Sequence, residues 1–288
     1  MRKKLPSLLF GLIFLIGFGI LMYPTISNQW NTYRQSKLIS NYEQVVSEMT
    51  PEDFTDQWKQ AEALNDTITS NNVYADVFGA SDEDKLVGTE YWNVLNVSGD
   101  GIMGYLSVPK IHIKLAIYHG TGDKVLQTGI GHLNGTKLPI GGESNHSVIA
   151  AHRGLPSAKL FTDADQLETG DKFYIHVLDK VLAYQVDQIL PMVDKDDHAT
   201  LESALQIEDG QDQVTLFTCT PYGVNSHRLL VRGTRVPYNG EEEESDSVGN
   251  TMLKSIQNYY MLYLILGLAI TLLVIFIMRK VLKGDSRR

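Results

Sequence analysis

The side chains with the clearest chemical potential in this chain are one thiol and one guanidinium. Cys219 is the only cysteine of the sequence, and it follows the apolar run 213–218, while Arg228 begins the next β-rich run, 228–236. A thiol attacks carbonyl groups as the thiolate, and its ordinary pKa of about 8.5 leaves little thiolate at neutral pH without a nearby cation or base. If Cys219 is a nucleophile, we therefore expect a histidine near it.

One of the eight histidines has a context that suits this role. His152 follows the apolar run 148–151, which delivers it to the end of a strand, and it precedes Arg153-Gly154-Leu155-Pro156, where the chain must turn. Strand ends and loops are where reactive groups gather. The other histidines share no pattern, and the sequence has no HExxH motif or paired cysteines, so it indicates neither a metal site nor a cofactor.

The positions of Cys219 and Arg228 become informative together. If the runs 213–218 and 228–236 pair as antiparallel neighbours, both residues lie at the bases of the connecting loop, on one rim. Arg228 could then stabilise a substrate carbonyl or the oxyanion formed on it. Two plainer readings stay open: Cys219 as a buried structural cysteine, which is a common fate of free cysteines, and Arg228 as a surface ion-pair partner.

Short β-rich runs with turn-forming residues between them occupy residues 101–237. Several strands at this spacing, with only brief helical patterns such as 199–205, predict a β-barrel or sandwich of about 135 residues. The predicted strands are 104–108, 111–118, 146–151, 172–177, 181–190, 213–218 and 228–236.

The region before the barrel reads as helical and then irregular. Apolar residues three or four positions apart over 28–49 predict an amphipathic helix. Thr50-Pro51-Glu52-Asp53 offers an N-cap, a proline at the first helical position and an acid in the first turn, so a second helix is predicted to about residue 64. Residues 65–101 are polar and read as a long irregular connection.

Two uncharged, mostly apolar runs, 5–23 and 259–278, each approach the ~20 residues that a helix needs to cross a bilayer. A cleaved signal peptide is the alternative for the first run, although 22–26 lacks an obvious cleavage site. Basic residues flank both outer ends, so both termini are expected in the cytoplasm and 24–258 outside. These residues are Arg2, Lys3, Lys4, Arg279, Lys280, Lys283, Arg287 and Arg288.

The segment between the tails is acidic. The tails hold eight basic residues and Asp285, so the formal net charge of −9 becomes −16 for residues 5–278. This charge repels phosphate backbones, and no basic cluster with interleaved aromatic residues is present, which makes nucleic acid an unsuitable partner.

At this point the chain resembles a known family. Thr215-Leu216-Phe217-Thr218-Cys219 resembles the TLxTC signature of sortases, the cysteine transpeptidases of Gram-positive cell surfaces, and Arg228 stands at the family's arginine position. Further segments resemble class C, the pilin-polymerising group. They are Leu138 to Gly142, the His152-Arg153-Gly154 turn, Leu155 to Phe161 and Thr220 to Gly233.

The resemblance implies a mainly β fold, an eight-stranded sortase β-barrel with N-terminal helices and a lid loop, flanked by two transmembrane helices. The expected division is 1–23, an N-terminal transmembrane segment or signal anchor; 24–100, an extracellular helical region with the lid loop; 101–237, the catalytic barrel; 238–258, a solvated acidic linker; 259–278, a transmembrane helix; and 279–288, a basic cytoplasmic tail.

It also implies the roles of the site residues. Cys219 would be the nucleophile, His152 the proton donor and base, and Arg228 the stabiliser of the carbonyl oxygen. In class C the lid commonly carries Asp-Pro-Phe or Asp-Pro-Trp, and the counterpart here is Asp76-Val77-Phe78. Asp76 would meet Arg228 and Phe78 would cover Cys219. Valine in place of proline departs from the pattern and leaves the loop freer when open.

The implied substrates are pilins or surface proteins with an LPXTG-like sorting signal. Cys219 would cleave the Thr-Gly bond and pass the acyl group to a lysine amine of another pilin, without a cofactor. Three alternatives remain: anchoring of surface proteins to the cell-wall precursor, hydrolysis by a cysteine protease, and a catalytically silent scaffold for pilus assembly.

Overall fold

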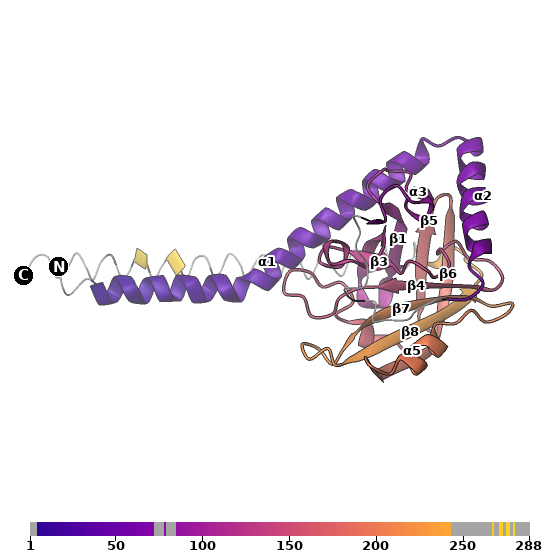
Figure 1. Ribbon diagram of the computed structural model, residues 1–288. Coiled ribbons are helices and arrows are strands. Elements are labelled where there is room, and N and C mark those ends of the chain that lie inside the picture. The colour runs from indigo at the N-terminus through magenta and orange to yellow at the C-terminus, as the bar shows by residue number, and fades with distance from the viewer. Residues whose placement is uncertain are drawn as a thin grey trace, which may run out of the picture. The chain divides into compact units, whose positions relative to one another are not determined.

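The computed structural model describes residues 5–71, 78, 85–242, 267, 271–272, 275–276 and 279, and places eight strands in one closed barrel. The order around the barrel is β1-β2-β3-β4-β7-β8-β6-β5, and all neighbours are antiparallel except β2 with β3 and β4 with β7. The predicted mainly β, eight-stranded fold is confirmed (Figure 1). The strands are β1 Ile102–Val108, β2 Ile113–His119, β3 Ile130–His132, β4 Asn145–Ala150, β5 Lys172–Val177, β6 Lys180–Asp194, β7 Asp212–Thr220 and β8 His227–Val236.

The predicted strands all exist, and one was missed. β3 spans only three residues, Ile130–His132, which is too short to show an alternation in sequence. β6 runs to Asp194, beyond the predicted end at residue 190, because β8 pairs with it across two register shifts. The short helix α3 Glu90–Asn93 precedes β1, and four more lie between the strands: η2 Pro109–Ile111, α4 Asp123–Leu126, η3 Ala164–Gln166 and α5 His198–Ala204.

Two compact units divide the chain, residues Ser27–Glu242 and residues Met1–Ile26 with Glu243–Arg288. The helix α1 Leu5–Ser47 begins in the second of these and joins two segments that the sequence analysis treated separately. Among the described residues, α1 is the one helix whose length and apolar composition suit a membrane crossing. The expected second span, 259–278, falls largely outside the described residues.

Within the unit Ser27–Glu242, α1 packs on the barrel through one face. Ile39 and Tyr42 are buried there, and Gln35 donates to the carbonyl of Thr128 and accepts from the amide of Ala116. Trp30 and Tyr33, which belonged to the predicted periodic set, are exposed. Gln35 was not in that set because its polar side chain gives no hydrophobic signal.

The helix α2 Pro51–Thr67 starts where it was predicted and extends three residues further. The Thr50 hydroxyl accepts from the amide of Asp53, and the Asp53 carboxylate accepts from the amide of Thr50. This reciprocal pair satisfies two of the amides that a helix start leaves unbonded. In Figure 1 α2 stands beside the barrel near β5 and β6, and Trp58 donates to Asp179 in the turn between those strands.

Apolar side chains form a barrel core and a separate outer cluster. The core takes one set of alternating residues from β7 and β8, such as Leu216 and Val231. The outer cluster takes the other set, and it is covered by Leu201 of α5 and by Leu205, which directly follows this helix. Its buried members are Val148, Ala150, Val193, Leu201, Leu205, Phe217 and Leu230.

The acidic run after β8 begins differently from the expected solvated linker. Tyr238 packs edge-on against Tyr174 of β5, Glu241 pairs with Lys172, and Glu242 is buried with its carboxylate 2.7 Å from His176. The chain therefore stays on the barrel wall to Glu242, because β5 offers a basic and aromatic edge to these acids.

His132 provides a test of the fold through its response to acid. Its ring is fully buried, with Nε2 2.9 Å from the carbonyl of Lys137 and Nδ1 2.9 Å from the Tyr91 hydroxyl. Burial disfavours the charged ring and lowers the pKa of His132 to about 3. The unfolded chain takes up this proton near pH 6.5 and the folded protein does not, so stability falls as the pH drops between these values.

We expect the free energy of unfolding to fall by about 1.4 kcal/mol per pH unit through His132 alone between about pH 6 and pH 4. Urea titrations at several pH values measure this slope. His132→Gln should flatten it, and His198→Gln, which changes an exposed histidine, should not. Equal slopes for wild type and His132→Gln would contradict the prediction.

Candidate active site

Three strand ends bring His152, Cys219 and Arg228 into one row across the barrel wall. β7 and β8 pair antiparallel, as predicted, with Cys219 directly opposite Arg228. β4 and β7 pair in parallel, and one further bond joins the amide of Ala151 to the carbonyl of Phe217 at 3.1 Å. The register ends with Ala150 opposite Phe217, and continuing it by two residues places His152 beside Cys219. Side chains of such a row share one face.

That face is the outside of the barrel. Phe217 and Leu230 belong to the outer cluster, and each lies two residues from Cys219 or Arg228 on the same strand. Because alternate residues of a strand share a face, Cys219 and Arg228 project beside the outer cluster. α5 covers the cluster, so the row lies at the end of an apolar wall.

The guanidinium of Arg228 is held by the end of the loop between β7 and β8 and by the first residue of β8. Its Nη1 donates to the carbonyls of Asn225 and His227, both at 2.9 Å. The residue is only 3% exposed, so the cation sits in a setting that water screens poorly. Arginine keeps its charge at every working pH. Arg228 is therefore a fixed positive charge opposite the thiol.

The imidazole of His152 is half-buried at the end of β4. Burial lowers its pKa, and the negative charge of Asp123, at the start of α4, opposes part of that effect. At neutral pH the ring is consequently neutral and able to accept a proton. A neutral imidazole beside a thiol is the arrangement that general-base activation of the nucleophile needs.

Phe78 lies over the row. Its ring stacks on the ring of His152 with centroids 5.2 Å apart and an interplanar angle of 19°, and it lies 6.0 Å from the ring of Phe217. The guanidinium carbon of Arg228 is 5.3 Å from the centre of the Phe78 ring, within the range of a cation–π contact. Asp76, the other expected lid residue, falls outside the described residues.

The comparisons with known proteins agree with this geometry. The Sortase domain model matches residues 106–236. Sortase C of Streptococcus pneumoniae is 43% identical, with a TM-score of 0.62 over 70% of this chain and 97% of the solved one. The chain belongs to the sortase family. Sortase C1 of Streptococcus agalactiae gives 44% identity and a TM-score of 0.62 over 70% of this chain and 100% of that one.

Curated relatives agree on the family at lower identity. Sortase A of Bacillus anthracis is 27% identical over 158 residues, which are 54% of this chain and 70% of that protein. Sortase A of Streptococcus agalactiae serotype III is 30% identical over 124 residues, 41% of this chain and 47% of that protein. The protein is thus a sortase cysteine transpeptidase, with class C enzymes as its structural relatives.

Removing the Phe78 ring should open this sortase to small thiol reagents. Because the ring stacks on His152 and lies over Arg228, we expect Phe78→Ala to raise the rate at which iodoacetamide alkylates Cys219. Intact-mass spectrometry follows the reaction. Phe54→Ala, a partly buried aromatic of α2, is the matched control. Equal alkylation rates in wild type and Phe78→Ala would mean that the ring does not limit access.

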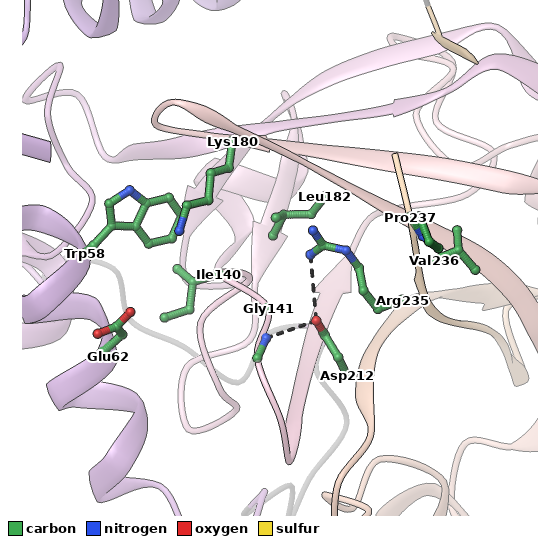
Figure 2. Close-up of a pocket in the computed structure, with 11 residues that line it drawn as sticks. Trp58, Glu62, Ile140, Gly141, Lys180, Leu182, Asp212, Arg235, Val236 and Pro237 are labelled. Carbon is green, nitrogen blue, oxygen red and sulfur yellow. Dashed lines mark hydrogen bonds and ion pairs between the residues drawn. The ribbon is translucent and has the colours of Figure 1, made fainter. Parts of the chain in front are cut away.

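A cavity of the sortase lies elsewhere, among the described residues. It measures about 530 Å³ and opens between α2 and the barrel, with Trp58, Lys180 and Glu62 on one side and Asp212 and Arg235 on the other (Figure 2). Asp212 begins β7, seven residues before Cys219, which is roughly 23 Å along a strand. The row of His152, Cys219 and Arg228 therefore lies far from this cavity, and a search by shape alone would not have led to it.

The sequence analysis missed residues that hold the loop after His152. Asn28 of α1 accepts from the amide of Lys159 at 2.8 Å, and Ser27 donates to the carbonyl of Pro156 at 2.8 Å. Both contacts join segments about 130 positions apart, and nothing in their local sequence announces them. Arg153 was noted only as part of a turn, although its neighbour His152 already marked the segment.

Proposed function

We propose that this sortase joins pilin subunits through a thioacyl intermediate on Cys219. The observation that carries the proposal is the transverse row of His152, Cys219 and Arg228 at the ends of β4, β7 and β8. It combines a nucleophile, a base and an oxyanion stabiliser on one face, which is the minimum set for acyl transfer through an enzyme thioester. The substrate is a surface protein with an LPXTG-like sorting signal.

In the first half-reaction His152 takes the proton of the Cys219 thiol, and the sulfur attacks the carbonyl carbon of the Thr-Gly bond. Arg228 stabilises the negative oxygen that forms. The carbon–nitrogen bond then breaks as His152 returns the proton to the leaving amine, and a thioester remains on Cys219. His152 serves in both directions because its neutral ring can accept the thiol proton, and burial, which disfavours the charged ring, favours passing that proton on to the leaving amine.

In the second half-reaction a lysine amine of another subunit attacks the thioester. His152 removes a proton from this amine, the carbon–sulfur bond breaks, and an isopeptide bond joins the two subunits. The free energy of the first amide is carried through the thioester, so the exchange needs no nucleotide. The Phe78 ring has to leave its place over the row before either substrate approaches, and Asp76 is proposed to hold the same lid through Arg228.

Structures of related sortases support a pilin substrate. The Streptococcus pneumoniae structure concerns pilin substrate specificity, and another relative from group B Streptococcus, 39% identical, is described as pilus-related. The long apolar start of α1 supports an anchor in the cell membrane, with 24–258 on the outer face and 101–237 as the catalytic region. The second span of the two-pass arrangement rests on the sequence alone.

Product analysis tests the proposal. The segment 24–258 is incubated with a candidate pilin that carries the sorting signal, and mass spectrometry identifies the bond that forms. We expect an isopeptide between the signal's threonine and a pilin lysine. Ligation to a peptidoglycan-precursor amine instead would favour cell-wall anchoring, a free threonine carboxylate would favour a protease, and unchanged pilin would contradict the proposal.

A further inference from the structure

We propose that Arg153 is a positioning residue that holds His152 and Cys219 side by side where the pairing of β4 with β7 ends. The proposal rests on the roles assigned above to His152 and Cys219. Arg153 directly follows His152, and its side chain contacts Thr220, which directly follows Cys219. It acts through these neighbours and makes none of the chemical steps itself.

The contacts of Arg153 join three pieces of chain. Nη1 donates to the Thr220 hydroxyl at 3.1 Å, Nε donates to the carbonyl of Thr162 at 3.1 Å, and Nη2 pairs with the Asp165 carboxylate at 2.5 Å. The side chain is 8% exposed, although it carries a permanent charge. A guanidinium buried to this degree and bonded through all three nitrogens has little freedom to move.

The side chain of Arg153 adds a contact between the two segments where the backbone hydrogen bonds between β4 and β7 end. The last bonds between the two segments before the row are Ala151 amide to Phe217 carbonyl at 3.1 Å and Thr218 hydroxyl to Ala151 carbonyl at 2.7 Å. Beyond them the chain turns away at Gly154, whose φ is +81°, so no further strand pairing follows. The bond from Arg153 to Thr220 supplies the next link.

His152 and Cys219 are thereby bracketed from both sides. On one side stand the two bonds of Ala151, and on the other stands the bond from Arg153 to Thr220. Without the second link the segment after β4 would be tied to β7 on one side of His152 only. Acyl transfer is sensitive to such freedom, because a misplacement of about 1 Å can cost on the order of 100-fold in rate.

The same guanidinium also shapes the loop that follows. Thr162 accepts from Arg153 through its carbonyl and from the amide of Gly154 through its hydroxyl at 3.3 Å, while the amide of Phe161 donates to the carbonyl of His152 at 3.3 Å. The loop folds back on the residue that carries the imidazole. Arg153 therefore fixes both the backbone of His152 and its offset from Cys219.

Steady-state kinetics on an LPXTG-like peptide with a lysine-containing acceptor tests the proposal. Arg153→Met should lower kcat about 100-fold with a small change in KM. The alkylation of Cys219 by iodoacetamide, measured in alkaline buffer, should stay near the wild-type rate, because hydroxide can then take the thiol proton in place of His152. A variant that has lost its fold would change both kcat and the alkylation rate.

Variants at two other positions distinguish a positioning role of Arg153 from a general loss of structure. Arg232→Met removes an arginine of similar burial on β8 that pairs with Asp187 and Glu208 away from the row, and it should keep the wild-type kcat. Thr220→Val removes only the hydroxyl that Arg153 contacts. It should reproduce part of the loss, while Thr220→Ser should not, and Arg153→Met should cost less in the Thr220→Val background than in the wild type.

The outcomes separate this inference from the proposed function. A wild-type enzyme that forms no thioester contradicts the function. The pH profile of Cys219 alkylation then still tests the positioning role of Arg153. Arg153→Met should alter that profile in the same way as His152→Ala does, and the variant that carries both substitutions should show no further change. Equal losses of kcat in Arg153→Met and Arg232→Met, or additive effects of Arg153→Met and Thr220→Val, would overturn the positioning role.

Discussion

Cys219→Ala is expected to lower the transpeptidation rate roughly 10⁶-fold, as removal of the nucleophile does in other acyl-transfer enzymes. The reason is that the chain holds no other cysteine, so no second thiol can form the thioester. The substitution removes one sulfur atom from a residue that is 6% exposed, and the barrel should remain folded. Gel analysis of high-molecular-weight pilin polymers, together with peptide turnover, measures the effect.

Ser147→Ala is a suitable control for Cys219→Ala. Ser147 lies fully buried on β4, and its hydroxyl has no hydrogen-bond partner among the residues that the structure describes. Its removal should leave activity intact and the melting temperature unchanged or higher, because an unsatisfied buried hydroxyl costs stability. Polymers that persist in Cys219→Ala would instead identify the protein as a scaffold for assembly.

Arg228→Met is expected to lower kcat about 100- to 1,000-fold, the usual cost of losing one oxyanion-stabilising donor. Arg228 lies directly opposite Cys219, and two bonds to the carbonyls of Asn225 and His227 fix its guanidinium. A preorganised charge of this kind needs no rearrangement when the oxyanion forms. Stopped-flow measurement of acylation and steady-state kinetics give the loss in the two half-reactions.

Arg228→Lys makes the same prediction more specific. Lysine keeps the positive charge but loses the planar fork that the carbonyls of Asn225 and His227 hold in place. We expect Arg228→Lys to recover only a small part of the loss seen in Arg228→Met. A raised KM with an unchanged kcat in both variants would contradict the proposed role, because it would show that Arg228 binds the substrate without stabilising the transition state.

Local sequence patterns predicted most of the barrel and the pairing of Cys219 with Arg228. Two β-rich runs with a short loop between them suggest an antiparallel pair, and this pairing alone sets the two residues opposite each other. The position of His152 beside Cys219 could not be predicted from local sequence patterns. β4 and β7 are parallel neighbours far apart in the chain, and no local signal indicates which strands meet across a barrel; the family resemblance supplied that link.

The contacts that hold the site were harder to foresee. Arg153 reaches Thr220 across 67 positions, and Ser27 and Asn28 reach the same loop from the N-terminal helix. Polar side chains of this kind leave no periodic pattern, because their partners are single carbonyls or hydroxyls set by the tertiary fold. Phe78 was expected to cover Cys219, and its described contacts are with His152, Arg228 and Phe217.

The mass of the acyl enzyme tests the central claim most directly. The enzyme is mixed with an LPXTG-like peptide in the absence of an acceptor, quenched in acid, and examined by intact-mass and tandem mass spectrometry. The account predicts an added mass equal to the peptide up to its threonine, located on Cys219 and lost when a lysine amine is supplied. An adduct on any other residue, or peptide cleavage by wild type and Cys219→Ala alike, would contradict it.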